Sequence, residues 1–292
     1  MRNETTLRPI LIAGLGVTFL SFLDAAMKVI SETYPLMQAV TMRYGAGAVF
    51  AVLIYVILGG GRPSLAAVRR NAARAIIVLG TAACFFTAIA RLPLVEAITL
   101  TFLAPLLMAL LGRVILKESV AMRALIAILV GFAGVIVIAR GQEAGQGHSF
   151  DLIGLLAALG CAFFYALSMV LMRQQTSRDS TLTIVLLTNC LAFLFVLPTG
   201  VWTWQPVPLT HWLITAAVGF FGTCGHLCLA WAYARSHAAR LSVMEYVAFI
   251  WAMIFGYFIF AEIPTSWTLA GATLIMAACL FATFSQPGSK AA

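Results

Sequence analysis

Charged residues are scarce in this sequence. Asp, Glu, Lys and Arg make up 10% of the 292 residues, whereas 62% are hydrophobic and the mean hydropathy is +1.01. Because a soluble domain carries about 25% charged residues, this composition excludes a soluble protein with a large core. It predicts an all-α integral membrane protein whose apolar helices cross the bilayer.

Cysteines are missing from the polar segments, and so is a signal-peptide cleavage site. All six cysteines lie inside apolar stretches, so we expect no framework of disulfides. The first apolar run follows Arg2 and Arg8, but no small-residue cleavage site precedes a polar mature chain. We interpret this run as a retained first helix and not as a removed signal.

Motifs of enzymes and metal sites are also missing. The sequence has no phosphate-binding loop, nucleophile elbow or metal-ligand motif. Cys224 and Cys228 share one face of a helix, but His226 between them points away, which is poor geometry for a metal. We expect no catalysis, no metal and no cofactor.

Ten apolar stretches each approach the length of about 20 residues that a bilayer requires. The connections between them are short, and the longest glycine-rich polar segment is GQEAGQGHSFD, from Gly141 to Asp151. We predict spans at roughly 9–30, 36–58, 74–91, 94–116, 121–139, 153–173, 181–201, 212–235, 239–260 and 266–284.

Basic residues gather on one side of these spans. With the N-terminus inside, 14 of the 18 Lys and Arg residues fall at cytoplasmic ends. The bias predicts that both termini are cytoplasmic, and it accounts for the net charge of +8 without a nucleic-acid partner. The expected partners are the lipid bilayer and a small-molecule substrate.

The two halves of the chain match each other at a constant offset of 144 residues. Five spans per half is an odd number, so the halves are expected to lie upside down relative to each other, as in many secondary transporters. We predict a first repeat at 1–140, a linker at 141–151 and a second repeat at 152–292. Matching pairs include Gly16 and Gly160, Arg91 and Arg235, Gly112 and Gly256, and Glu118 and Glu262.

Each half ends in the same order: a small-residue span, a kinked span, a glutamate and a glycine-rich span. The first copy contains RLPLVEAITLTFLAPLLMALLGRVILKE and the second RLSVMEYVAFIWAMIFGYFIFAE. In this order and over essentially the whole chain, the sequence resembles the drug/metabolite transporter superfamily, EamA-like branch. One departure is that Ala248-Phe249 stands where many members keep a glutamate-proline pair.

The resemblance implies a bacterial inner-membrane transporter that exports small metabolites by alternating access through a central cavity. Members that export amino acids, including the aromatic amino acid type, are nearest in size, so aromatic and other neutral amino acids are the expected substrates. Alternatives are another small metabolite, a cationic drug or proton-coupled antiport. A membrane-embedded enzyme is a weaker alternative because no acids, histidines or serine cluster near one face. The sequence does not indicate an oligomeric state.

Pro105 lies near the middle of the apolar stretch from Leu94 to Glu118. A proline breaks a helix and frees the carbonyl four residues earlier, here that of Thr101, which could face a substrate ammonium. The alternative is a packing kink absorbed by neighbouring helices. The hydroxyls of Thr99 and Thr101 could line the cavity or could bond only to their own helix.

Three charged residues lie in the first two spans. Asp24 and Lys28 are four residues apart, so they share a face and could pair. Lys28 could instead extend to the headgroups. Arg43 could bind a substrate carboxylate, or pair with Glu32 or Glu96.

Three glutamates are candidates for gating or coupling. Glu118 and Glu262 end equivalent spans and are expected at opposite membrane faces, where they could close the two mouths or only orient helix ends. Glu245 could carry a coupling proton.

The remaining candidates for the cavity are aromatic or polar. His226 and Asn189 could face the cavity or bond to a neighbouring helix. An apolar pocket for an aromatic side chain could be formed by Phe85, Phe86, Tyr165, Trp231 and Tyr246, although helix packing explains each one singly.

Overall fold

The computed structural model describes residues 4–116, 122–143, 151–175, 178–233, 244 and 246–284, and these residues contain helices and turns without a strand. Apolar stretches end at polar or proline-containing turns, and two helices begin at a serine cap: Ser64 accepts from Ala67 N and Ser180 from Thr183 N. The helices are α1 (Glu4–Thr33), α2 (Leu36–Ile57), α3 (Leu65–Arg91), α4 (Leu94–Thr101), α5 (Ala104–Leu116), α6 (Met122–Glu143), α7 (Leu152–Gln175), α8 (Thr181–Trp202), α9 (Leu209–Tyr233), α11 (Val247–Phe260) and α12 (Ser266–Phe284).

The ten predicted spans correspond to these helices. Within the described residues, seven helical segments are long and apolar enough to cross a membrane, and three more apolar helices are shorter. The third span was predicted to begin at 74 but begins at Leu65, because Asn71 and Arg74 are covered by neighbouring helices and do not end the helix. Three residues of the predicted linker, Gly141 to Glu143, continue α6.

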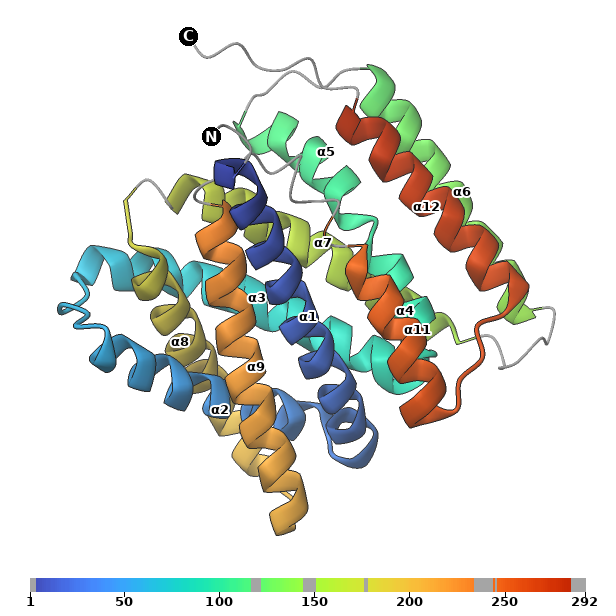
Figure 1. Ribbon diagram of the computed structural model, residues 1–292. Helices are drawn as coiled ribbons and strands as arrows, with labels where there is room; N and C mark the ends of the chain where they lie inside the picture. Colours follow the sequence, from blue (N-terminus) through green and yellow to red (C-terminus); the bar gives the residue numbers. More distant parts are fainter. Residues whose placement is uncertain are drawn as a thin grey trace, which may run out of the picture.

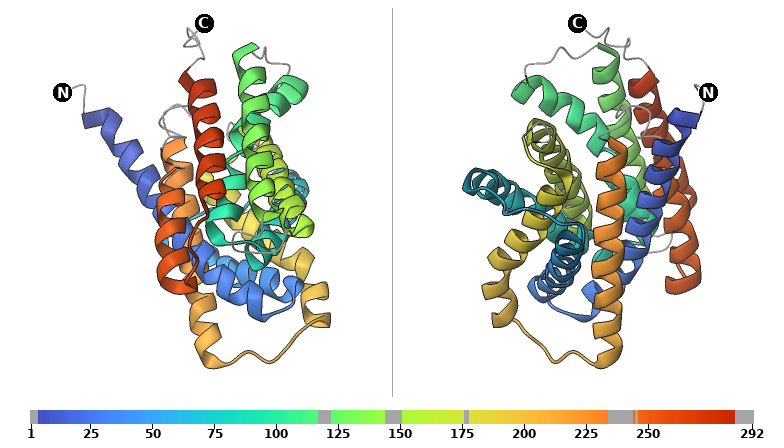
Figure 2. Two further views of the ribbon diagram at one scale, coloured as in Figure 1. Left: turned by 90° about the vertical axis from the view of Figure 1, so that its right-hand side faces the viewer. Right: turned by 60° about the vertical axis from the view of Figure 1, so that its left-hand side comes forward.

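The helices pack in pairs that join the two halves of the chain. The most extensive contacts are α1 with α9, α3 with α7, α2 with α8 and α6 with α12. Exchanging the halves converts the first pair into the second and maps each of the other two onto itself, as two related repeats require. Figure 1 shows α6 and α12 side by side at one edge, and Figure 2 shows the same pair from a second direction.

Small residues at equivalent positions allow these pairs to approach closely. A methyl group added to Gly16 of α1 would lie 3.0 Å from Cys228 Cβ of α9, and one added to Gly160 of α7 would lie 3.1 Å from Cys84 Sγ of α3. Both contacts follow the offset of 144 residues. The repeat found in the sequence is therefore also a repeat of packing, with small residues at helix crossings as membrane proteins use them.

The fourth span is broken as the proline predicts. Helix α4 ends at Thr101 and α5 begins at Ala104, because Pro105 has no N–H to donate to the carbonyl of Thr101. The equivalent position in the second repeat also starts a helix: α11 begins at Val247, which corresponds to Leu103. Pro105 is therefore not the feature that distinguishes the two copies at this position.

The two helix starts meet in space. The rings of Phe102 and Tyr246 stand edge to face with centroids 5.6 Å apart, and these residues are related by the offset of 144. Contact between equivalent residues is expected on the axis that relates two repeats. The described start of α1 and the end of α12 lie at the same end of the bundle (Figure 1).

Candidate functional site

Lys28 lies at a junction of four helices. Its Nζ is 2.7 Å from Oε1 of Glu262 and 3.6 Å from Oε1 of Glu32, and it donates to the carbonyls of Ile89 and Leu92, each at 2.9 Å. The side chain is 3% exposed. Lysine is thus held between a carboxylate and the last carbonyls of α3, where a positive charge is favoured.

Glu262 holds the other side of this junction. Its Oε2 accepts a hydrogen bond from Leu94 N at 2.7 Å, at the first turn of α4, where backbone N–H groups have no helical partner. Ala261 precedes it with φ of 53°, a left-handed conformation that ends α11 and lets Glu262 N donate to Gly256 O at 2.8 Å. We call Lys28, Glu262, Leu92 and Leu94 the junction cluster.

Two expectations for Lys28 are corrected by this geometry. It does not pair with Asp24, four residues earlier, because Glu262 and the α3 carbonyls surround its nitrogen. It also does not extend to the headgroups, since α1, α3, α4 and α11 enclose it. The sequence could not show this pairing because Glu262 belongs to the other repeat.

A second polar group lies deeper, between α1, α2, α8 and α9. Arg43 is 5% exposed, and its Nη1 donates to Asn189 Oδ1 at 3.5 Å. The charge of Arg43 acts on the half-buried Asp24 carboxylate and on the ring of His226. We call these four residues the central polar group. Asn189 thus forms the interhelical hydrogen bond considered above.

His226 is the most open member of the central polar group. Its Nδ1 lies 2.7 Å from Gly222 O in its own helix, and the side chain is exposed even though two arginines act on it electrostatically.

Sequence reasoning missed two neighbours of this group. Arg74 lies in α3 and is 7% exposed, and Tyr44 of α2 donates its OH to Val78 O at 3.4 Å. Arg74 was assigned to the cytoplasmic end of the third span because that span was started too late. The alanine pairs between 66 and 73 were the signal that the helix begins earlier.

The broken fourth span supplies backbone groups more than side chains. Thr99 Oγ1 donates to Val95 O at 2.6 Å and Thr101 Oγ1 to Ile98 O at 2.7 Å, so both hydroxyls bond to their own helix. Cys279 Sγ of α12 donates to Phe102 O at 3.1 Å. Pro105 is half-buried, and one carbonyl of the break already has a partner.

The aromatic candidates pack on two clusters of core residues. Phe85 and Phe86 of α3, with ring centroids 6.1 Å apart, and Tyr165 of α7 pack on the main core, as does Tyr246. Trp231 packs instead on a small separate cluster around Ala13 and Ala232. The single aromatic pocket therefore stays a prediction.

Two of the three glutamate candidates, Glu118 and Glu245, lie outside the described residues. Glu96 is 5% exposed in α4, and its Oε1 accepts from Thr268 Oγ1 of α12 at 2.8 Å. Within the described chain, no group of three His, Cys, Asp or Glu side chains could hold a metal ion.

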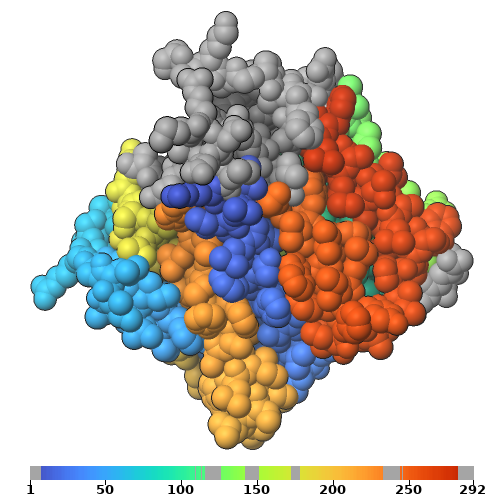
Figure 3. Space-filling view, viewed as in Figure 1, coloured from blue at the N-terminus to red at the C-terminus, as the bar shows by residue number. Residues whose placement is uncertain are grey.

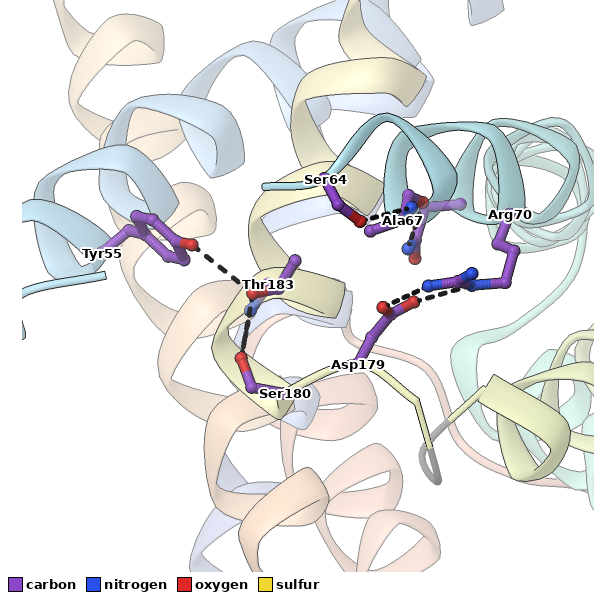
Figure 4. Close-up of polar contacts among 8 residues, drawn as sticks. Tyr55, Ser64, Ala67, Arg70, Asp179, Ser180 and Thr183 are labelled. Carbon is purple, nitrogen blue, oxygen red and sulfur yellow. Dashed lines mark hydrogen bonds and ion pairs between the residues drawn. The ribbon is translucent and has the colours of Figure 1, made fainter. Parts of the chain in front are cut away.

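The starts of α3 and α8 are joined by another ion pair. Arg70 Nη2 and Nε donate to the two oxygens of Asp179 at 2.6 and 3.2 Å, as Figure 4 shows. The starts of α3 and α8, with their serine caps, flank a surface pocket of about 320 Å³. Ser64 and Ser180 each cap their own helix, and the Arg70–Asp179 pair holds α3 to the start of α8.

Asp151 caps the start of α7. Its Oδ1 accepts from Gly154 N at 2.8 Å, and its Oδ2 is 3.0 Å from Arg91 Nη1. The hydrogen bond from Gly154, together with Arg91, holds the pKa of this carboxyl below its usual range. The start of the second repeat is thereby tied to the end of α3.

The chain is similar in sequence to several bacterial transporters. The pseudopaline exporter CntI of Pseudomonas aeruginosa is 27% identical over 286 residues, covering 96% of this chain and 97% of that protein. The riboflavin transporter of Vibrio cholerae is 27% identical over 192 residues, covering 65% of this chain and 63% of that protein. The S-adenosylmethionine uptake transporter of Rickettsia prowazekii is 23% identical over 197 residues, covering 68% and 65%.

One solved crystal structure has the same fold. It superposes with a TM-score of 0.66 at 21% sequence identity, over 94% of this chain and 96% of that chain. The model of the EamA-like transporter family matches the chain twice, at residues 7–140 and 152–284, which together cover most of its length. The chain is therefore a member of the EamA-like transporter family.

Proposed function

We propose that this transporter exports small metabolites by alternating access across a bacterial inner membrane, and that its substrates are neutral amino acids, including aromatic ones. The observation that carries the proposal is the junction cluster. It joins α1 and the α3–α4 turn of the first repeat to the end of α11 in the second, through Lys28 and Glu262.

The junction cluster acts as the closed gate at the outer end of the bundle. With both termini in the cytoplasm, as the basic residues predict, the ends of α1, α3 and α11 face outwards. A buried ion pair that joins the two repeats holds them together at this end, and its loss releases one repeat from the other. Glu262 is therefore a gating residue and Lys28 its partner.

The central polar group lines part of the substrate site. Asp24, Arg43 and His226 come from three helices of the two repeats, and the charge of Arg43 acts on both of the others. Charged side chains at this depth in a membrane mark substrate pathways. Both signs of charge suit a zwitterion better than a cation, which argues against a cationic drug because Arg43 would repel it.

Purified protein in liposomes tests this function. Liposomes that contain the protein in the inside-out orientation are expected to take up labelled phenylalanine or leucine above the level of empty liposomes. Unlabelled amino acids are expected to compete with this uptake. A panel of sugars, riboflavin and cations provides the control. If a sugar or cation is carried and no amino acid is, the substrate class is wrong while the transporter role stands.

A pH gradient separates coupled from uncoupled transport. The proposal does not require protons, so flux is expected to be the same with and without the gradient. Acceleration by the gradient would favour the antiporter alternative.

A further inference from the structure

Arg74 is a buried cation with two nitrogens that have no hydrogen-bond partner among the described residues. Its side chain is 7% exposed, and in the described part of the chain no acceptor lies within hydrogen-bonding distance of Nε or Nη1. A charge in hydrocarbon costs several kcal/mol, and such residues are retained where they bind substrate or a counter-charge. Arg74 lies nine residues inside α3 and is covered by neighbouring helices.

Asn71, one turn earlier on the same face of α3, is an unpartnered acceptor. Its Nδ2 donates to Ala67 O at 2.9 Å, but Oδ1 has no donor among the described residues, and the side chain is fully buried. Residues three apart on a helix are neighbours. A pair of free donors and a free acceptor thus lie side by side.

Arg74 differs from the neighbouring arginine of the same helix, Arg70. Arg70 on the same helix is satisfied by both oxygens of Asp179, so the lack of a partner is specific to Arg74. The charge of Arg74 also acts on Tyr44 and on His226 of the central polar group.

We propose that Arg74 binds the carboxylate of the substrate and that Asn71 Oδ1 accepts from its ammonium group, so the transported class is α-amino carboxylates. This inference rests on the proposed function and narrows it. Arginine presents two parallel N–H groups to a carboxylate, and Nε with one Nη is a suitable fork. The atoms are closed off from solvent in this conformation, so the substrate reaches them when the helices beside α3 separate.

Three probes that share one ring separate the two contacts. L-phenylalanine carries both groups, 3-phenylpropionate lacks the ammonium and phenethylamine lacks the carboxylate. Each is tested for thermal stabilisation of the protein in detergent, which does not require transport, and for competition against labelled phenylalanine flux in liposomes.

The variants Arg74→Gln and Asn71→Leu are expected to divide these probes. Arg74→Gln weakens phenylalanine and 3-phenylpropionate about tenfold or more, as loss of a charged hydrogen bond does, and leaves phenethylamine within about threefold. Asn71→Leu weakens phenylalanine and phenethylamine but not 3-phenylpropionate. Arg74→Lys keeps the charge and recovers part of the carboxylate binding.

Arg70→Gln is the matched control, because this arginine is one turn away and already paired. It lowers thermal stability without changing the ratio between the three probes. Equal weakening of all probes by Arg74→Gln and Arg70→Gln would overturn the inference, as would wild-type protein that binds phenylalaninamide as well as phenylalanine. Carboxylate-dependent thermal stabilisation without amino-acid flux would support the role of Arg74 and contradict the proposed function. Amino-acid flux in which Arg74→Gln affects all three probes equally would support the proposed function and contradict the role of Arg74.

Discussion

Lys28 and Glu262 are 234 residues apart in the chain and 2.7 Å apart in space, and their contact joins the first repeat to the second. Each also completes a helix end: Lys28 donates hydrogen bonds to the last carbonyls of α3, and Glu262 accepts one from the first N–H of α4. The space-filling view in Figure 3 shows α1 packed along α9 and next to α11, the surface over which the repeats meet.

Removing one charge of this pair is expected to open the gate. Glu262→Gln leaves Lys28 buried without a full counter-charge, which costs about 3–5 kcal/mol for a buried pair. The conformations should shift towards the outward-open state, measured as faster labelling of a cysteine introduced at Leu92. Glu32→Gln is the control, since this partner is at 3.6 Å and 44% exposed and contributes about 1 kcal/mol or less. Equal labelling in both variants would remove the gating role.

Ala261 is expected to tolerate glycine and reject a branched residue. Its φ of 53° costs an L-residue roughly 1–2 kcal/mol, which glycine avoids. Ala261→Gly should therefore raise the melting temperature in detergent or leave it unchanged, whereas Ala261→Val should lower it. A lower melting temperature for Ala261→Gly than for Ala261→Val would show that the left-handed turn is not formed.

Phe102 and Tyr246 are expected to be energetically coupled. An edge-to-face pair contributes about 0.5–1.5 kcal/mol beyond its buried area. In a double-mutant cycle of Phe102→Leu and Tyr246→Leu, unfolding free energies should be non-additive by that amount. Phe85→Leu with Tyr246→Leu serves as the control cycle. Additive losses in the Phe102 cycle would show that the two helix starts do not touch.

Gly134 is expected to be intolerant of a methyl group. A Cβ there would lie 2.8 Å from Gly271 O, a backbone atom of α12 that cannot move aside alone. Gly134→Ala should cost about 1–3 kcal/mol, read as a lower melting temperature and less folded protein. Gly61→Ala meets nothing within 4 Å and should be neutral. If Gly134→Ala leaves the melting temperature as unchanged as Gly61→Ala does, the close crossing of α6 and α12 is contradicted.

Local chemistry made much of the fold predictable. Apolar stretches of bilayer length gave the spans, the offset of 144 gave the repeat, and Pro105 placed the break in the fourth span because it lacks an N–H. These features depend on residues close together in the chain. The second repeat has no proline at the equivalent position, so its own residues do not indicate that α11 starts at Val247. That start could be inferred only by transferring the helix break of the first repeat to the second.

The candidate site was less predictable because it depends on contacts between repeats. Asp24 and Lys28 share a helix face, yet Lys28 pairs with Glu262 of the other repeat. Asp24 is instead influenced by the charge of Arg43 in α2. Arg74 was lost with the first two and a half turns of α3. Spacing within one helix indicates which side chains share a face, but it does not show which face of another helix lies opposite.

Counterflow in liposomes tests the central claim, that the chain carries amino acids by alternating access. Vesicles preloaded with unlabelled phenylalanine are diluted into labelled phenylalanine without any ion gradient. The account predicts transient accumulation of label above equilibrium, because the carrier exchanges one substrate for another. Uptake that only rises to equilibrium, or none above empty vesicles, would contradict it.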